Sequence, residues 1–192
     1  MIFSICFAML FAKIKKYKIS YLFSSWTFYP IIVFTIIIFI LQFSVFIGDY
    51  NFIKYASLIK TANLFTFLIP LFFYKQYNTG LIGSAFIIIG TLLNKFVMAQ
   101  NNGKMPVYPS LSYLTGYFKP NAIIEANDNI HIMGNENTAW KILTDYIDVG
   151  FSILSIGDLF IHFFALLVIY QTIKVLNKKY NTNGNLQSTR VS

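Results

Sequence analysis

The chain has 192 residues, of which 56% are hydrophobic, 19% aromatic and only 11% charged. A soluble domain carries about 25% charged residues because water must wet its surface, so this composition excludes an ordinary soluble domain. The net charge of +8 does not indicate nucleic-acid binding, because the basic residues form no stripe with interleaved aromatics on a polar domain. Lysines beside membrane spans, attracted to anionic lipid headgroups, explain the charge more simply.

The N-terminal segment begins with an apolar run over residues 1–12. As a helix this run covers about 18 Å, against about 30 Å of hydrocarbon. It lacks the basic residues that open a signal peptide. We interpret 1–17 as a short first span whose lysines snorkel, with an interfacial helix as the alternative. Lys13, Lys15, Lys16 and Lys18 then form a basic strip that suits headgroup binding. Cys6 is the only cysteine, so no intrachain disulfide exists.

Three further spans follow along the chain. Residues 26–48 carry no charge until Gly48-Asp49, and residues 55–74 contain Pro70, which predicts a kinked helix. The hydrophilic break at 75–80 is so short that the flanking spans should form an antiparallel hairpin. The fourth span, 80–99, carries Asn94 and Lys95 near its end.

The fifth predicted span, 149–173, follows a long polar segment at 100–148. We expect this segment to be partly structured, because the pattern of Trp140, Leu143, Tyr146 and Ile147 predicts an amphipathic helix over 138–148 capped by Asn137. Residues 175–192 are predicted to be a disordered cytoplasmic tail. The sequence thus predicts an all-α polytopic bundle of about five spans, in one transmembrane domain at 1–174.

Charge asymmetry predicts the orientation. The segments at 13–25, 75–80 and 174–192 hold nine Lys or Arg and no acid, whereas the other side holds six bases and all seven acids. Basic loops stay cytoplasmic. The N-terminus is therefore expected outside, with the 100–148 segment, and the C-terminus inside.

Motifs for a defined chemistry are absent from the sequence: it contains no HExxH, P-loop, GxSxG or paired cysteine ligands. His131, Asp145 and Asp148 suggest either an outer metal site or, more simply, solvated loop residues. We predict no cofactor and no catalytic residue.

The costliest polar groups form a candidate cluster near the ends of the last two spans. Lys95 and Asp158 lie at similar predicted depths, and charges near hydrocarbon are expensive unless paired. Asn94 and His162 are expected to complete this cluster by hydrogen bonding. Asp158 and His162, four residues apart, share one helix face, which fits either a proton relay or a structural contact between helices.

A longer motif pattern extends from the fourth predicted span into the fifth. It runs from Asn94 through Asn101-Asn102-Gly103-Lys104-Met105-Pro106-Val107 and His131…Thr138…Leu143-Thr144-Asp145 to Ser155-Ile156-Gly157-Asp158. It resembles an uncharacterised family of small bacterial membrane proteins with the pattern N-G-G-x-M-P-V, H…T…L-x-D and S-x-G-D. Asn102 replaces the first glycine, and Asn also tolerates a left-handed turn. The resemblance implies a bacterial plasma membrane and a candidate outer-face site that comprises Asn101, Gly103, Met105, Pro106, His131, Thr138 and Asp145.

Two functional hypotheses remain. In the first, the chain is a non-enzymatic accessory, assembly or sensing component that binds membrane lipid or a protein partner in the membrane. In the second, it is a small transporter or intramembrane enzyme that uses Lys95, Asp158 and His162. The first is favoured because polar residues within the spans are few, whereas transport paths usually show more of them, often with broken helices.

Overall fold

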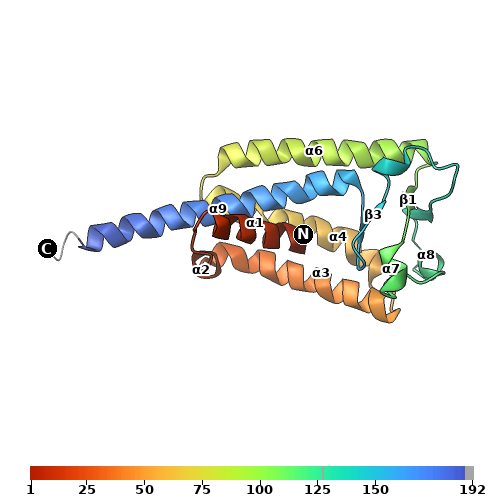
Figure 1. Cartoon of the computed structure of the whole chain (residues 1–192), viewed down its shortest axis with the longest axis horizontal. Coiled ribbons are helices and arrows are strands. Elements are labelled where there is room, and N and C mark those ends of the chain that lie inside the picture. The colour runs from red at the N-terminus through yellow and green to blue at the C-terminus, as the bar shows by residue number, and fades with distance from the viewer. Residues whose placement is uncertain (127, 189–192) are drawn as a thin grey trace. The chain divides into compact units, whose positions relative to one another are not determined.

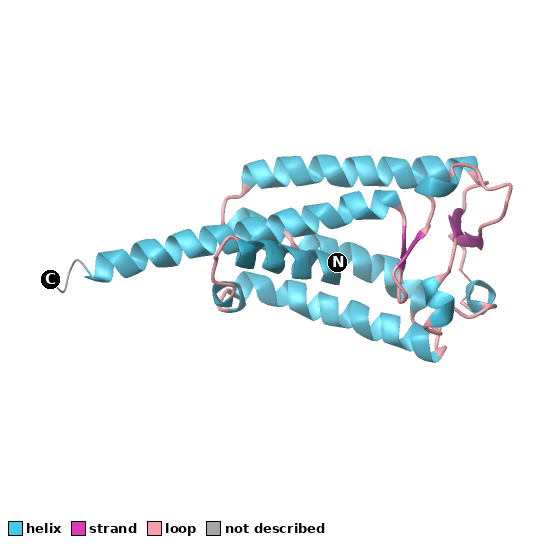
Figure 2. Ribbon diagram, in the orientation of Figure 1, coloured by secondary structure: helices cyan, strands magenta, loops and turns pink. Residues whose placement is uncertain are grey.

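The protein is mainly helical, as the sequence predicts. The structure, a computed structural model, describes residues 1–126 and 128–188, without the side chains of 183–188. Helices make up 67% of the chain and there is almost no sheet (Figures 1 and 2). By length and composition, four helices are able to cross a membrane: Trp26–Ile47, Ile53–Phe73, Tyr77–Gln100 and Ile156–Thr182. This confirms the all-α fold class and gives the chain the features of a membrane protein.

The helices and strands have the following bounds. The α-helices are α1 (Ile2–Ile14), α2 (Ser20–Phe23), α3 (Tyr29–Ile47), α4 (Ala56–Thr66), α5 (Leu68–Phe73), α6 (Tyr77–Gln100), α7 (Leu111–Leu114), α8 (Ala122–Glu125) and α9 (Ile156–Ser188). The 3₁₀ helices are η1 (Trp26–Phe28), η2 (Ile53–Tyr55) and η3 (Lys141–Leu143). The strands are β1 (Met105–Val107), β2 (His131–Met133), β3 (Ile147–Asp148) and β4 (Ile153–Leu154).

The chain divides into two compact units. Unit 1 consists of residues 1–35, 62–84 and 162–192, and unit 2 of residues 36–61 and 85–161. The boundaries fall within helices, so α3, α4, α6 and α9 each continue covalently from one unit into the other. The prediction of one transmembrane domain over 1–174 stays a prediction.

Unit 1 is built from helices packed closely through small residues. Ala8 and Ala12 of α1 are fully buried. A side chain at Gly83 of α6 would collide with the Phe164 ring of α9, so glycine allows the two helices to approach. Phe164 also contacts Phe67, which lies at the junction of α4 and α5. The centroids of the two rings are 6.2 Å apart. Small residues play this role in membrane helices because lipid gives little hydrophobic drive for their association.

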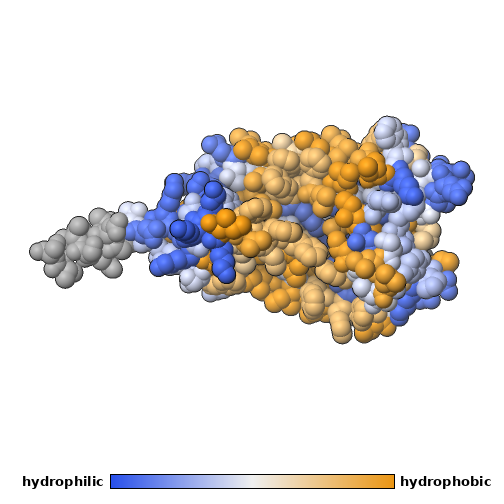
Figure 3. Space-filling model, in the orientation of Figure 1, coloured by the Kyte–Doolittle hydropathy of each residue, from blue (hydrophilic) through white to orange (hydrophobic). Residues whose placement is uncertain are grey.

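Unit 2 contains a second close approach of α6 to α9 and the segment that joins them. A side chain at Gly90 would collide with the carbonyl oxygen of Gly157. Residues 101–155, called the connector below, carry four short strands and two four-residue helices. Hydrophobic residues dominate the visible surface over the middle of the long helices, whereas the connector's visible surface, and that over the helix ends away from it, is mostly hydrophilic (Figure 3).

The helices at the second, third and fourth predicted spans end within three residues of the predicted bounds, whereas the first and last helices differ more. The first helix, α1, has only 13 residues and is too short to cross about 30 Å of hydrocarbon as a helix. The predicted kink at Pro70 is a break between α4 and α5 at Phe67, because proline cannot donate to the carbonyl four residues earlier.

The last helix differs most from its prediction. It begins at Ile156 instead of 149, because β3 and β4 form an antiparallel hairpin before it. It also continues to Ser188, where the sequence predicted a disordered tail from 175. Residues 189–192 lie outside the described residues.

The amphipathic helix predicted over 138–148 is wrong. The only helix over 138–148 is the short η3, preceded by Trp140 in the left-handed region (φ 55°) and followed by extended Thr144, and the segment ends in strand β3. Asn137 caps no helix: its N–H donates to Oδ1 of Asn135. The backbone at Asp145 instead bonds to β1, so a long-range strand contact competes successfully with the local helical periodicity.

Candidate functional site

The turn after α6 fastens the connector to the end of that helix. Asn102 and Gly103 both have positive φ (56° and 77°), which reverses the chain before Pro106 as the sequence predicts. The buried Asn101 side chain donates to the Val97 and Ala139 carbonyls and accepts from the Ala139 N–H at 3.0 Å. Asn101 therefore brings the neighbourhood of Thr138 to the end of α6.

Strand β1 brings the predicted outer-face residues together. One of its edges pairs in parallel with β2, with Met105 opposite His131 and Pro106 opposite Ile132. Its other edge bonds to Asp145: the Asp145 N–H donates to the Pro106 carbonyl at 3.1 Å, and the Asp145 carbonyl accepts from the Tyr108 N–H at 2.9 Å. His131 and Asp145 thus reach one place from opposite edges of the same strand.

The His131 imidazole lies between two carboxylates. Its Nδ1 is 2.7 Å from Oδ2 of Asp128, and its Nε2 is 3.4 Å from Oδ2 of Asp145. Oδ1 of Asp128 also accepts from the N–H groups of Ile130 and His131. Sequence reasoning selected His131 and Asp145 but missed Asp128, although the i, i+3 spacing of Asp128 and His131 was visible.

This arrangement holds His131 in its charged form. Burial alone would lower the pKa of His131, but hydrogen bonds to Asp128 and Asp145, and their charges, raise it to about 9. Burial opposes ionisation of Asp128, yet the hydrogen bond and charge of His131 hold the pKa of that carboxyl well below its usual range. Burial raises the pKa of Asp145, and nearby Asp158 adds to this rise. The Asp128–His131 pair is therefore the ionised part of the group at neutral pH.

Asp148 does not join this group. Its Oδ2 accepts from the Ser110 and Ser112 N–H groups, and its Oδ1 accepts from the Ser112 hydroxyl and the Gly150 N–H. Asp148 therefore organises the residues before α7 and the β3–β4 hairpin. The suggested metal site of His131, Asp145 and Asp148 is not formed. Among the described residues, no group of three or more His, Cys, Asp or Glu side chains is placed to hold a metal ion.

Aromatic side chains complete the connector's surface. The Lys141 ammonium lies 4.6 Å from the ring centroid of Tyr108 and 5.6 Å from that of Tyr146. Trp140 packs edge-on against Phe96 of α6, with ring centroids 5.4 Å apart. Thr138 accepts from the Asn135 N–H through its hydroxyl. These contacts hold Lys141 and Thr138 within the connector and Trp140 against α6.

The polar cluster predicted near the membrane is formed in part, as a helix cap. The Ser155 hydroxyl accepts from the Asp158 N–H at 3.0 Å, and the Asp158 carboxylate accepts from the Ser155 N–H at 3.3 Å. This reciprocal pair is a capping box at the start of α9. Asn94 joins it by donating to Asp158 at 3.0 Å and accepting from the Ser155 hydroxyl at 2.8 Å.

Lys95 does not belong to this cap. Lys95 is exposed, and the ion pairs recorded for the described residues do not include one with Asp158. The expected Lys95–Asp158 pair is therefore wrong, because the capping box and Asn94 already satisfy the carboxylate. Nε2 of His162 lies 3.1 Å from the N-terminal amine of Met1, in unit 1.

One further polar residue was passed over by sequence reasoning as a site. Asn63, on α4 in unit 1, is fully buried, and neither atom of its side-chain amide has a hydrogen-bond partner among the described residues. Burying a side-chain amide without a hydrogen-bond partner costs free energy, so Asn63 carries a desolvation cost in a helix that is long and apolar enough to cross a membrane.

Comparisons with known proteins agree with the resemblance seen in the sequence. Searches of curated proteins and of solved structures found no match. A family model described as a family of unknown function (DUF5317) matches residues 19–170, which include both parts of the candidate site. The chain therefore belongs to this family of unknown function, DUF5317.

Proposed function

We propose that this chain is a non-enzymatic integral protein of the bacterial plasma membrane that binds a protein partner through its connector. Four helices long and apolar enough to cross a membrane support the membrane location. The lysine-rich segments at 13–18 and 174–179, taken with the acid-bearing connector, support a connector outside and a C-terminus in the cytoplasm. In this proposal the chain is an accessory, assembly or sensing component, and the partner is another protein of the same complex.

The observation that carries this proposal is how the connector uses its side chains. Asp128, His131 and Asp148 are engaged in contacts within the connector. By contrast, three large apolar side chains are strongly exposed: Leu114 of α7 (85%), Ile124 of α8 (80%) and Ile142 of η3 (67%). Polar groups that fix a shape, combined with exposed apolar side chains, are typical of a preformed binding surface.

The connector's charge favours a protein over a lipid surface. It carries five acids against three lysines and the charged His131, hence a net charge of −1. Anionic lipid headgroups would repel this surface, whereas a protein partner can match both the acids and the apolar side chains.

The transporter or enzyme alternative has less support. It requires Lys95, Asp158 and His162 to act together, but Asp158 caps α9 and Lys95 is exposed. His131 has a carboxylate at each ring nitrogen, which leaves neither nitrogen available to act as a base.

Photo-crosslinking in native membranes tests the proposal. A benzophenone amino acid replaces Leu114, Ile124 or Ile142 in separate variants, and a control places it at Ile40, an exposed residue of α3. We expect the connector positions to give the same discrete protein adduct and Ile40 to give lipid adducts. Lipid adducts from all three connector positions would show that the connector lies on the membrane, and would overturn the proposal of a protein partner.

A further inference from the structure

Unit 1 carries an uncompensated positive surface. Its three segments contain no Asp or Glu. They contain eight described lysines, called the basic face below, and all are exposed except the half-buried Lys174: Lys13, Lys15, Lys16, Lys18, Lys75, Lys174, Lys178 and Lys179. No carboxylate within the unit can therefore neutralise this face.

Specific hydrogen bonds assemble the basic face from segments far apart in the sequence. The Asn177 side chain of α9 accepts from the Lys18 N–H at 2.8 Å and donates to the Lys18 carbonyl at 3.0 Å. Gln76, next to Lys75, donates to the Thr172 hydroxyl at 2.8 Å. Thr172 and Asn177 are five residues apart, or about 7.5 Å along a helix. The basic strip and Lys75 are thus both held against the same stretch of α9.

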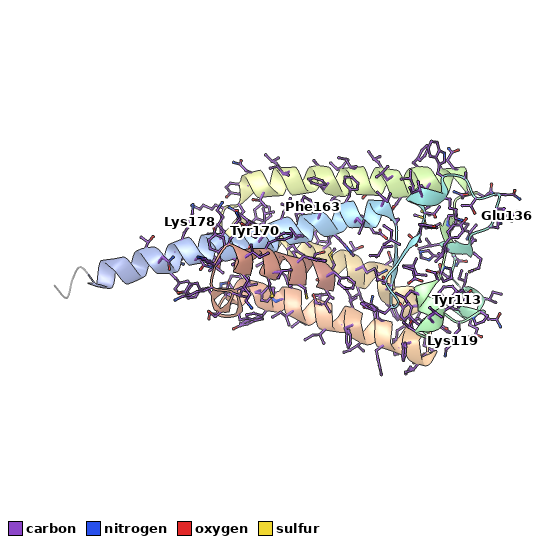
Figure 4. All side chains as sticks on the ribbon, viewed as in Figure 1. Tyr113, Lys119, Glu136, Phe163, Tyr170 and Lys178 are labelled. Carbon is purple, nitrogen blue, oxygen red and sulfur yellow. The ribbon has the colours of Figure 1, made fainter. Side chains whose placement is uncertain are left out.

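Aromatic side chains accompany the lysines. Tyr21 stacks on Tyr180 with ring centroids 4.4 Å apart, and Tyr17 contacts Tyr170 at 6.3 Å; Figure 4 labels Tyr170 and Lys178 on α9. Trp26 is half exposed and packs on Phe73. Tyrosine and tryptophan gather where hydrocarbon meets the headgroups. Their presence beside the lysines supports a position of the basic face at headgroup level.

We propose that the basic face is a binding site for the phosphate groups of anionic phospholipids. Clustered lysines next to membrane spans attract anionic headgroups, and here the hydrogen bonds of Asn177 and Gln76 fix the lysine-bearing backbone before any lipid binds. Such preorganisation lowers the entropy lost on binding. The site is separate from the connector, so it neither requires nor follows from the partner-binding proposal.

Lipid binding to the full-length protein in detergent tests this site. Native mass spectrometry compares phosphatidylglycerol with phosphatidylcholine of the same acyl chains. We expect about tenfold tighter binding of phosphatidylglycerol to the unmodified chain, because the lysines recognise its net negative charge. The triple variant K16Q/K178Q/K179Q should lose most of that preference, whereas the matched variant K54Q/K95Q/K119Q, which removes three lysines from unit 2, should keep it.

Three results would overturn the proposal: equal binding of the two lipids to the unmodified chain, an equal loss in both triple variants, or displacement of the lipid by inorganic phosphate at equal concentration. The arginine variant K16R/K178R/K179R should retain the preference, since it keeps the charges. If the glutamine triple variant fails to fold, the double variant K16Q/K178Q must show an intermediate loss, and an unchanged preference there would also contradict the site.

Discussion

Nε2 of His131 lies 3.4 Å from Oδ2 of Asp145 because the two residues flank opposite edges of the same short strand, β1. Asp128, on the other side of the imidazole, completes a charge-compensated group that ties three parts of the connector together. This group gives the connector its shape, and its chemistry makes that shape depend on pH.

The first prediction concerns that dependence. The pKa of His131 is raised to about 9 in the folded protein, against about 6.5 in an unfolded chain. The group's stabilisation is therefore complete below about pH 6.5 and is lost as the pH rises through about 9. Hydrogen exchange of the connector amides, corrected for intrinsic rates, should accelerate between pH 8 and 10, while exchange in α6 stays slow.

Variants sharpen this test. His131→Gln should destabilise the connector by about 1–2 kcal/mol, the range for a partly exposed charged hydrogen bond, and should abolish the acceleration at high pH. Glu136→Gln removes a charge from an exposed residue of the same connector (labelled in Figure 4). It should change neither the stability of the connector nor the acceleration of hydrogen exchange at high pH. An unchanged pH profile in His131→Gln would show that His131 is not the titrating group.

A second prediction follows from the close approach of α6 and α9. A side chain at Gly157 would collide with Asn94 and with the Gly90 carbonyl, so Gly157→Ala should destabilise the protein by about 1–3 kcal/mol. Gly80→Ala is the matched control, because its side chain would meet only the tip of Leu71 and alanine favours the helix by about 1 kcal/mol. Thermal unfolding in detergent measures the stability of both variants. Equal shifts of the unfolding temperature in Gly157→Ala and Gly80→Ala would contradict the close packing of α6 and α9 at Gly157.

Ser155 and Lys95 give a third prediction. Ser155→Ala removes the capping hydroxyl and should cost about 1 kcal/mol. Lys95→Met removes an exposed lysine and should change stability by less than about 0.5 kcal/mol. If Lys95→Met lost more stability than Ser155→Ala, the result would indicate an ion pair between Lys95 and Asp158 and would contradict the structure.

A fourth prediction concerns orientation. Cysteines at the exposed Glu136 and Lys178, in a Cys6→Ser background, serve as reporters of the two sides of the membrane. In intact cells a membrane-impermeant thiol reagent should label the Glu136 position, and should reach the Lys178 position only after permeabilisation. The reverse pattern would invert the proposed topology.

Much of the fold could be predicted because apolar runs of bilayer length are local features. The span at 26–48 is one such run, and Pro70 marks the break in its neighbour. The cap at the start of α9 was also visible, since Ser155 and Asp158 have the spacing of a capping box. It was missed because an acid near a span suggested an intramembrane charge.

The connector could not be predicted in the same way. Strands β1 and β2 have three residues each and pair across 26 positions, Met105 with His131, so no local periodicity indicates them. The pattern over 138–148 favoured a helix, but the backbone bonds of Asp145 to β1 and the left-handed Trp140 depend on distant segments. For the same reason the pairing of His131 with Asp145 was not predictable from spacing.

The most direct test of partner binding compares the connector in two environments. Cysteines placed at Leu114 and Ile142 in the Cys6→Ser background are labelled with a thiol reagent in native membranes and in lipid nanodiscs that hold the purified protein. The account predicts labelling at least about tenfold slower in native membranes at both positions, and equal rates in the two environments for a cysteine at Glu136. Equally fast labelling of the cysteines at Leu114 and Ile142 in both environments would contradict partner binding. Equally slow labelling in both environments would also contradict it, because it would show that lipid covers the connector's apolar side chains.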